Sequence, residues 1–289
     1  MKSTVQHEHL RGDAALPGEA AILPLHEHEN FSVASVVLGR RAQRHLLAIY
    51  GFARLVDQLG DEAPGDRGAL LDALEHELEL TYGGLPRHPL MQRLQVTVEA
   101  CALPRGPFER LIEANRLDQR RTDYTTFAEL IGYCRLSADP VGELVLHVFR
   151  SATPDRIALS DKVCTALQLA EHWQDVAEDA ARGRVYLPAE DRDRFGVGRD
   201  ELLAPHASPA LRELLAFEVE RGRGLLDEGA PLVGTLRGRA RLAVAGYVAG
   251  GRAAFDAVEA AGYDVLPGAP KARKQARLRR TVQTWRSGR

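Results

Sequence analysis

Apolar residues recur at three- and four-residue intervals through most of this chain, and this helical periodicity limits the fold more than any other feature. Breaks rich in glycine and proline, such as Pro64-Gly65 and 83–86, interrupt the pattern. We expect helices from about Arg40 to Pro64 and around 70–78, and further ones at about 88–101, 107–120, 126–137, 141–150, 155–182, 209–228 and 236–261. Strand-like alternation is nearly absent. The pattern therefore predicts an all-α bundle in a single domain.

Composition excludes several classes of protein. The 289 residues carry 38 Lys and Arg against 40 Asp and Glu, so the chain lacks the strong positive field of a nucleic-acid-binding protein. Its three cysteines, Cys101, Cys134 and Cys164, lie far apart in apolar stretches, which favours a reducing cytosol over a disulfide framework. No apolar stretch approaches the length that crosses a bilayer. We expect a cytoplasmic protein with no nucleic-acid partner.

The two ends of the chain differ from its middle. Residues 1–29 are polar and aperiodic, with His-Glu-His triplets at 7–9 and 26–28, and indicate a flexible arm rather than a metal site. Residues 30–266 form the expected helical domain. Residues 267–289 form a basic tail, with eight Lys or Arg and no acid from Lys271 onward. This tail either lies against anionic lipid at the inner face of the membrane or is a solvated, partly disordered segment.

Two acidic stripes carry the chemistry. Tyr50, Arg54, Asp57 and Asp61 have offsets of 0, 4, 7 and 11, which places them on one face of a helix. A second stripe has offsets of 0, 3, 7 and 11, with Glu178 alongside, and consists of Gln168, Glu171, Asp175 and Asp179. Apolar residues surround both stripes, so we expect them to be partly buried.

Carboxylates gathered in a poorly hydrated cleft are costly unless cations compensate for them. Oxygen ligands of this kind favour Mg²⁺, which commonly takes its remaining ligands from substrate phosphates. Single acid pairs elsewhere, such as Glu75 with Glu79, are solvated helix faces; the duplicated stripe and the basic, aromatic segment at 183–188 strengthen the signal. A di-iron site is disfavoured because no histidine has a glutamate three residues before it.

Four ordered segments resemble the squalene/phytoene synthase family, and most closely its hopanoid-pathway branch, HpnC. They are ENFSVAS, AIYGFARLVDQLGDE, YCRLSADPVGELVLHVF and CTALQLAEHWQDVAEDAARGRVYLP, and the resemblance covers roughly Asn30 to Leu266. It implies the all-α isoprenoid synthase bundle, with a central cavity and acidic motifs at its mouth. It also implies a transferase of isoprenoid biosynthesis that uses Mg²⁺, with more than one ion, to ionise a prenyl diphosphate.

The resemblance also assigns roles to particular residues. Asp57 and Asp61 match the first Mg²⁺ motif, and Asp175 and Asp179 match the second. Tyr50, Arg54 and Arg184 match residues that handle the diphosphate, while Tyr186 lies in the segment that follows the second motif. Tyr133 and Gln168 match positions that line the cavity, and Gly142 matches a helix-breaking glycine in its wall. Four aromatic residues are candidates for the cavity wall or for ordinary core: Phe31, Phe52, Tyr133 and Phe149.

This chain departs from the family pattern at two positions. Gln58 stands where an aspartate is usual, and it lies about 100° off the first acidic stripe, so we expect it to support the metal ligands rather than replace one. Glu171 stands where an asparagine is usual. It either ligates Mg²⁺, positions a water together with His172, or pairs with a nearby cation.

Three functions stay open from the sequence. The HpnC-like branch implies ionisation of presqualene diphosphate and capture of the cation by water, which gives hydroxysqualene. A direct squalene synthase, which would use NADPH, or a phytoene-type synthase would instead join two prenyl diphosphates such as farnesyl diphosphate. The third is a catalytically weakened, membrane-associated paralogue that partners other enzymes of the hopanoid pathway.

Overall fold

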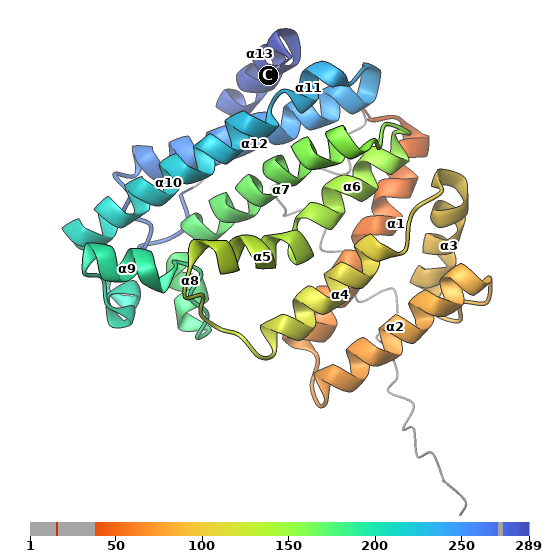
Figure 1. The fold of residues 1–289 in the computed structure, drawn as a ribbon, viewed down its shortest axis with the longest axis horizontal. Coiled ribbons are helices and arrows are strands. Elements are labelled where there is room, and N and C mark those ends of the chain that lie inside the picture. Colours follow the sequence, from red (N-terminus) through yellow and green to blue (C-terminus); the bar gives the residue numbers. More distant parts are fainter. Residues whose placement is uncertain (1–15, 17–37, 271–273, 289) are drawn as a thin grey trace, which may run out of the picture.

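The computed structural model describes residue 16, residues 38–270 and residues 274–288, with side chains from Arg280 onward in the last segment. The regular secondary structure of the described chain is helical (Figure 1). Its elements are α1 (Arg40–Asp57), η4 (Gln58–Glu62), α2 (Arg67–Gly83), α3 (Pro89–Cys101), α4 (Gly106–Asp118), α5 (Phe127–Ser137), α6 (Asp139–Val148), α7 (Pro154–Gln174), α8 (Val176–Ala181), α9 (Ala189–Phe195), η5 (Arg199–Leu203), α10 (Pro209–Gly229), α11 (Leu232–Thr235), α12 (Gly238–Ala260) and α13 (Lys274–Ser287).

Local sequence explains where several helices begin. The Thr153 hydroxyl accepts a hydrogen bond from the Arg156 backbone N–H, and Pro154 occupies the first turn of α7. Helix α10 begins in the same way: the Ser208 hydroxyl accepts a hydrogen bond from the Leu211 N–H, and Pro209 occupies the first turn. Such caps satisfy backbone donors that have no partner inside the helix.

The expected all-α fold is confirmed, and each predicted helix is present. The predicted helix at 155–182 is two helices, however, because Asp175 leaves helical geometry with φ −103° and ψ 18°. The short helices α9, η5 and α11 were not predicted. Residues 274–287 of the expected basic tail form helix α13, which packs along α12 beside α11 and was not predicted from the sequence.

The buried core has three parts that share helix α6. One cluster joins α1 to α4 and includes Leu144 of α6. A larger cluster runs from the end of α4 through α12 and includes Leu146. A small third cluster contains Leu46 of α1, Val145 of α6 and Ala243 of α12. Three consecutive residues of α6 thus join the whole bundle.

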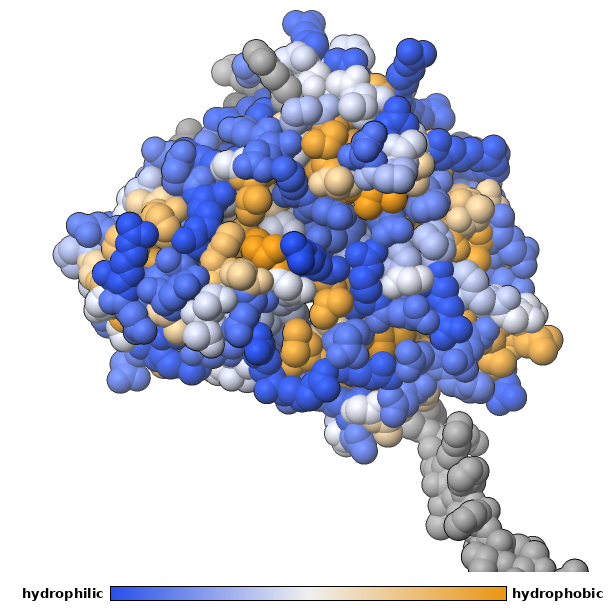
Figure 2. Space-filling view, viewed as in Figure 1, coloured by the Kyte–Doolittle hydropathy of each residue, from blue (hydrophilic) through white to orange (hydrophobic). Residues whose placement is uncertain are grey.

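The surface in Figure 2 is predominantly hydrophilic, with hydrophobic residues in separate patches. None of the helices in the described chain is both long enough and apolar enough to cross a bilayer. Both His-Glu-His triplets and Phe31 lie outside the described residues.

Candidate active site

The first acidic motif lies where α1 gives way to a π-helical turn. Asp57 is the last residue of α1 and Asp61 lies in η4, and both side chains are exposed. The turn is closed by the Ala63 N–H, which donates to the Gln58 carbonyl oxygen at 2.9 Å. A π-turn inside a helix costs regular hydrogen bonding and is found most often at functional sites.

Gly60 explains how this turn fits against the rest of the bundle. A Cβ atom at this position would lie 2.1 Å from Oδ1 of Asn115 on α4. Asn115 Nδ2 lies 3.5 Å from Asp57 Oδ1, and the Gln119 amide donates to the Gly60 carbonyl oxygen at 2.8 Å. The absence of a side chain therefore lets α4 hold the turn that carries both aspartates.

The second acidic motif spans the break between α7 and α8. Gln168 and Glu171 lie on the last turns of α7, Asp175 occupies the break and Asp179 lies on α8; all four are half-buried. Next to the break, Trp173 is fully buried, and the Gln174 amide donates to the Pro270 carbonyl oxygen. The buried Trp173 side chain and the Gln174 hydrogen bond anchor the end of α7. Because the helix breaks at Asp175, the four residues do not form one continuous stripe as predicted.

Arg184 joins the two motifs. Its guanidinium donates two hydrogen bonds to the Asp61 carboxylate, at 2.5 and 3.3 Å, and its backbone N–H donates to the Asp179 carbonyl oxygen at 2.9 Å. The ion pair with Asp61 raises the pKa of Arg184, so the guanidinium stays charged. The segment after the second motif is thereby held against the first motif.

A half-buried carboxyl group lies behind this ion pair. Asp118, at the end of α4, accepts a hydrogen bond from the Tyr133 hydroxyl at 2.9 Å. Burial raises the pKa of Asp118 to about 7, and the nearby charges of Asp61 and Asp57 act in the same direction, while Tyr133 and Arg184 oppose the rise. Sequence reasoning missed Asp118.

Aromatic rings form one wall beside the second motif. Tyr186 stacks on the His172 ring with centroids 3.6 Å apart, and Tyr124 and Tyr133 each lie 5.8 Å from Tyr186. His172 Nε2 lies 3.3 Å from the Gln168 amide, and Nδ1 lies 3.9 Å from Asp179. Burial lowers the pKa of His172 although Asp179 opposes this, so the ring is uncharged at neutral pH.

Other predicted residues lie near the first motif or in the core. Tyr50 and Arg54 lie on α1, and Arg54 donates to Glu62 at 3.2 Å. Phe52 is fully buried in edge-to-face contact with Phe108, at 5.0 Å, so the core interpretation holds for this residue. Phe149 lines a cavity at the other end of the bundle.

The expectation for Gly142 needs correction. The chain breaks between α5 and α6 at Ala138, four residues earlier, and Gly142 lies inside α6. A Cβ atom on Gly142 would lie 2.3 Å from Ser160 Oγ and 2.5 Å from Cys164 Sγ, both on α7. The glycine therefore lets α6 pack closely on α7 and does not break the helix.

The residues present suit a hard cation and a diphosphate. Among the described residues, no group of three His, Cys, Asp or Glu side chains is placed to hold a metal ion by itself. Paired aspartates fit Mg²⁺, which usually takes few protein carboxylates and completes its shell with water and phosphate oxygens. At the first motif, two buried polar atoms have no hydrogen-bond partner in the described chain: Gln58 Oε1, an acceptor for a cation or water, and Arg54 Nε, a donor for an anion.

A polar stripe on α4 could have revealed the missed residues. Asn115, Asp118 and Gln119 have offsets of 0, 3 and 4 and therefore share one face of that helix. The stripe contains a single acid, so it lacks the duplicated carboxylates on which the sequence interpretation depended. Tyr124, which lies in the loop after α4, has no periodic pattern around it.

An all-α bundle with paired aspartates on two helices, joined by an arginine beside an aromatic wall, defines an enzyme of the isoprenoid synthase type. The chain belongs to the squalene/phytoene synthase family, whose sequence model matches residues 25–285. This confirms the resemblance found in the sequence.

Individual relatives agree with this assignment. The chain is 33% identical over 222 residues to the hydroxysqualene synthase of Rhodopseudomonas palustris, covering 73% of each chain. It is 30% identical to the 15-cis-phytoene synthase of Synechocystis sp., covering 82% of this chain and 75% of the relative. The solved structure of squalene synthase HpnC from Alicyclobacillus acidocaldarius is 43% identical and superposes with a TM-score of 0.79, covering 85% of this chain and 94% of that one.

Proposed function

We propose that this enzyme converts presqualene diphosphate to hydroxysqualene, with release of diphosphate, in a Mg²⁺-dependent reaction. The observation that carries the proposal is the Arg184 bridge, which holds the Asp57/Asp61 and Asp175/Asp179 motifs together beside a buried aromatic wall. Similarity to the hydroxysqualene synthase of Rhodopseudomonas palustris and to HpnC supports this choice of reaction.

The residues divide into three tasks. Asp57, Asp61, Asp175 and Asp179 would hold Mg²⁺, which when bound withdraws electron density from the leaving diphosphate as a Lewis acid. Arg54 and Arg184 donate to the diphosphate oxygens, and Arg184 exchanges its hydrogen bonds with Asp61 for the substrate. Tyr50 lies one turn before Arg54 on the same face of α1 and contributes to the same anion site.

The reaction breaks one C–O bond and forms another. The electron pair of the cleaved bond leaves with the diphosphate, and the cation that remains rearranges against the faces of Tyr133 and Tyr186, near Gln168, which contacts His172. Water then forms a C–O bond to the cation and loses a proton, which yields the alcohol. Glu171, beside His172 on α7, positions this water.

A second candidate is condensation of two prenyl diphosphates, because the 15-cis-phytoene synthase of Synechocystis matches a larger share of this chain. A direct squalene synthase of this kind would consume farnesyl diphosphate and NADPH. The weakened-paralogue alternative is disfavoured because both aspartate pairs are present and joined. We place the enzyme in the cytoplasm, at the inner face of the membrane, in association with other hopanoid-pathway enzymes.

Product analysis tests the proposal. Purified enzyme with Mg²⁺ is incubated separately with presqualene diphosphate and with farnesyl diphosphate, each with and without NADPH, and products are identified by mass spectrometry. We expect hydroxysqualene from presqualene diphosphate without NADPH, abolished by EDTA and reduced at least a hundredfold by Asp175→Asn. Squalene that requires NADPH, or phytoene-type products, would establish the second candidate.

A further inference from the structure

Three helices begin at the end of the bundle opposite the acidic motifs. They are α1, α7 and α12, and both α1 and α7 run from this end toward an aspartate motif. The small core cluster of Leu46, Val145 and Ala243 holds α1, α6 and α12 together here. A Cβ atom on Gly39 would lie 2.5 Å from Arg239 Nη1, so the starts of α1 and α12 adjoin. We call this region, with its exposed arginines, the basic end.

The basic end contains few acids, of which Asp155, exposed in the first turn of α7, is one. Neither Asp nor Glu occurs in residues 38–56, 144–154 or 229–255. Six exposed arginines lie here, none in an ion pair with any residue that the structure describes: Arg40, Arg41, Arg44, Arg150, Arg237 and Arg239. The partial positive charge of three helix N-termini adds to theirs.

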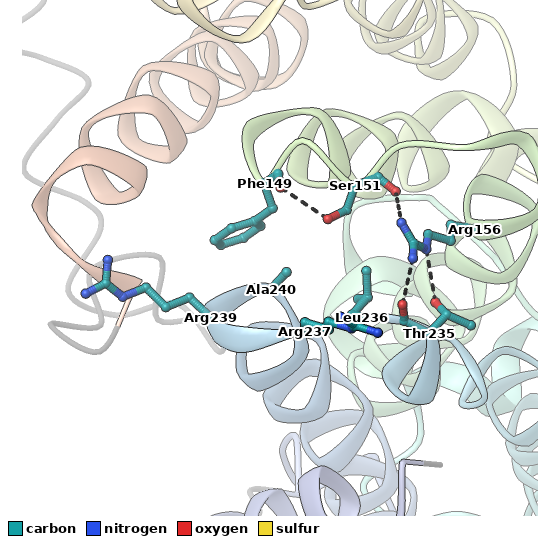
Figure 3. Close-up of a pocket in the computed structure, with 8 residues that line it drawn as sticks. All are labelled: Phe149, Ser151, Arg156, Thr235, Leu236, Arg237, Arg239 and Ala240. Carbon is teal, nitrogen blue, oxygen red and sulfur yellow. Dashed lines mark hydrogen bonds between the residues drawn. The ribbon is translucent and has the colours of Figure 1, made fainter.

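A cavity of about 600 Å³ lies within the basic end, between the α6–α7 turn and the start of α12 (Figure 3). Its lining is partly apolar, through Phe149, Leu236 and Ala240. Arg156 is fixed in its wall by hydrogen bonds to the Thr235 and Ser151 carbonyl oxygens, at 2.7 and 3.2 Å. Figure 3 shows Arg239 extending out of the cavity toward α1.

Helix α13 adds exposed apolar groups beside the basic end. Arg241 of α12 donates to the Trp285 carbonyl oxygen at 2.6 and 3.0 Å, which ties α13 to the first turn of α12. Thr284 points inward and is buried, whereas Val282 and Trp285 are each 43% exposed next to the exposed Arg286. A helix on the surface of a soluble protein normally buries its apolar side chains and exposes its polar ones.

We propose that the basic end and the adjoining face of α13 dock on an anionic lipid bilayer. Unpaired arginines match the negative headgroups, and an indole beside arginines suits the boundary between headgroups and acyl chains. Exposed Val282 and Trp285 favour lipid over nucleic acid, whose backbone offers them no apolar partner. The choice of partner also rests on the proposed function, whose product is a water-insoluble triterpene.

Vesicle flotation of the purified full-length chain tests this proposal without reference to turnover. We compare phosphatidylcholine vesicles with vesicles that also contain phosphatidylglycerol, at low and high salt. One variant combines Arg237→Gln with Arg239→Gln, and a second combines Arg40→Gln with Arg41→Gln. The matched control, Arg87→Gln with Arg194→Gln, removes two exposed charges from the α2–α3 turn and from α9.

We expect binding only to vesicles with phosphatidylglycerol, weakened by salt, and reduced by roughly an order of magnitude or more in both test variants but not in the control. Equal binding to both vesicle types, equal losses in control and test variants, or binding to duplex DNA but not to vesicles would overturn the proposal. Absence of any vesicle binding would also overturn it. Hydroxysqualene formation by these variants, measured in detergent, is a separate readout that tests the reaction alone.

Discussion

At the scale of single residues, Glu218 is a carboxyl group that the fold buries completely. It lies on α10 with no exposed surface, and its Oε1 has no hydrogen-bond partner in the described chain. Burial raises its pKa from 4.5 to about 8; nearby Asp191 adds to the rise and Arg221, at 3.4 Å, opposes it. The folded protein therefore holds this proton more tightly than the unfolded chain does.

This difference makes stability depend on pH. The contribution of Glu218 is fully present below pH 4.5 and is lost as the pH rises through about 8, because the folded state must then bury a charge. We expect Glu218→Gln to match the wild type in urea unfolding near pH 4.5 and to be more stable above pH 8. Glu220→Gln, exposed on the same helix, is the control. If Glu218→Gln were less stable than the wild type above pH 8, the ion pair between Arg221 and the Glu218 carboxylate would outweigh the cost of burying that charge.

The sequence drew attention to the four aspartates of the candidate site but not to the residues that surround them. Asp57, Asp61, Asp175 and Asp179 were found because duplicated acids at helical spacing are costly without a ligand. Asp118 and Tyr124 were not found, because a lone acid and an aromatic residue in a loop resemble ordinary surface and core. Asp118 and Tyr124 join the candidate site only through contacts between distant segments, with Tyr133 of α5 and with Tyr186 after α8.

At the scale of elements, the π-turn η4 depends on a contact between two helices. Gly60 allows Asn115 to approach, and Gln119 holds the turn from the same face of α4. Neither the π-turn nor the break at Asp175 follows from local periodicity, because each is held by a residue distant in sequence. The predicted helices themselves were correct because their apolar stripes and caps are local signals.

Substitution of Gly60 tests this dependence. We expect Gly60→Ala to lower the free energy of unfolding by about 1–3 kcal/mol, since the new methyl group overlaps Asn115 Oδ1. Turnover should fall as well, because the same turn carries Asp61. Adding Asn115→Ala should recover part of the stability. Gly224→Ala, at an exposed helical position with no nearby atoms, should instead be neutral or slightly stabilising in the same denaturation assay.

At the scale of the whole molecule, α6 joins the core clusters into one unit. Leu144, Val145 and Leu146 are all buried, and each belongs to a different cluster. Damage in one cluster can therefore reach the others through α6, and also through α4, which contributes Ile112 to one large cluster and Ala114 to the other. A bundle whose clusters were independent would instead lose its two halves in separate steps.

Leu144→Ala tests whether the clusters unfold together. We expect a loss of about 2–5 kcal/mol, because the fully buried side chain leaves a cavity. Unfolding followed by Trp173 fluorescence, in a Trp285→Phe background, should coincide with unfolding followed by far-UV circular dichroism, although Trp173 lies in the larger cluster. Transitions that separate in the variant would show that the clusters are independent.

The Arg184–Asp61 ion pair has a consequence for how the enzyme responds to its substrate. Arg184 already holds the Asp61 carboxylate in an ion pair, so entry of the proposed diphosphate substrate would be an exchange of partners rather than a simple addition. Exchange keeps the number of charge-assisted hydrogen bonds on Arg184 nearly constant and frees the Asp61 carboxylate at the moment when an anion enters. On the proposed function, a cation that binds Asp61 and a diphosphate that binds Arg184 would each break this ion pair, so each would favour binding of the other by the same factor.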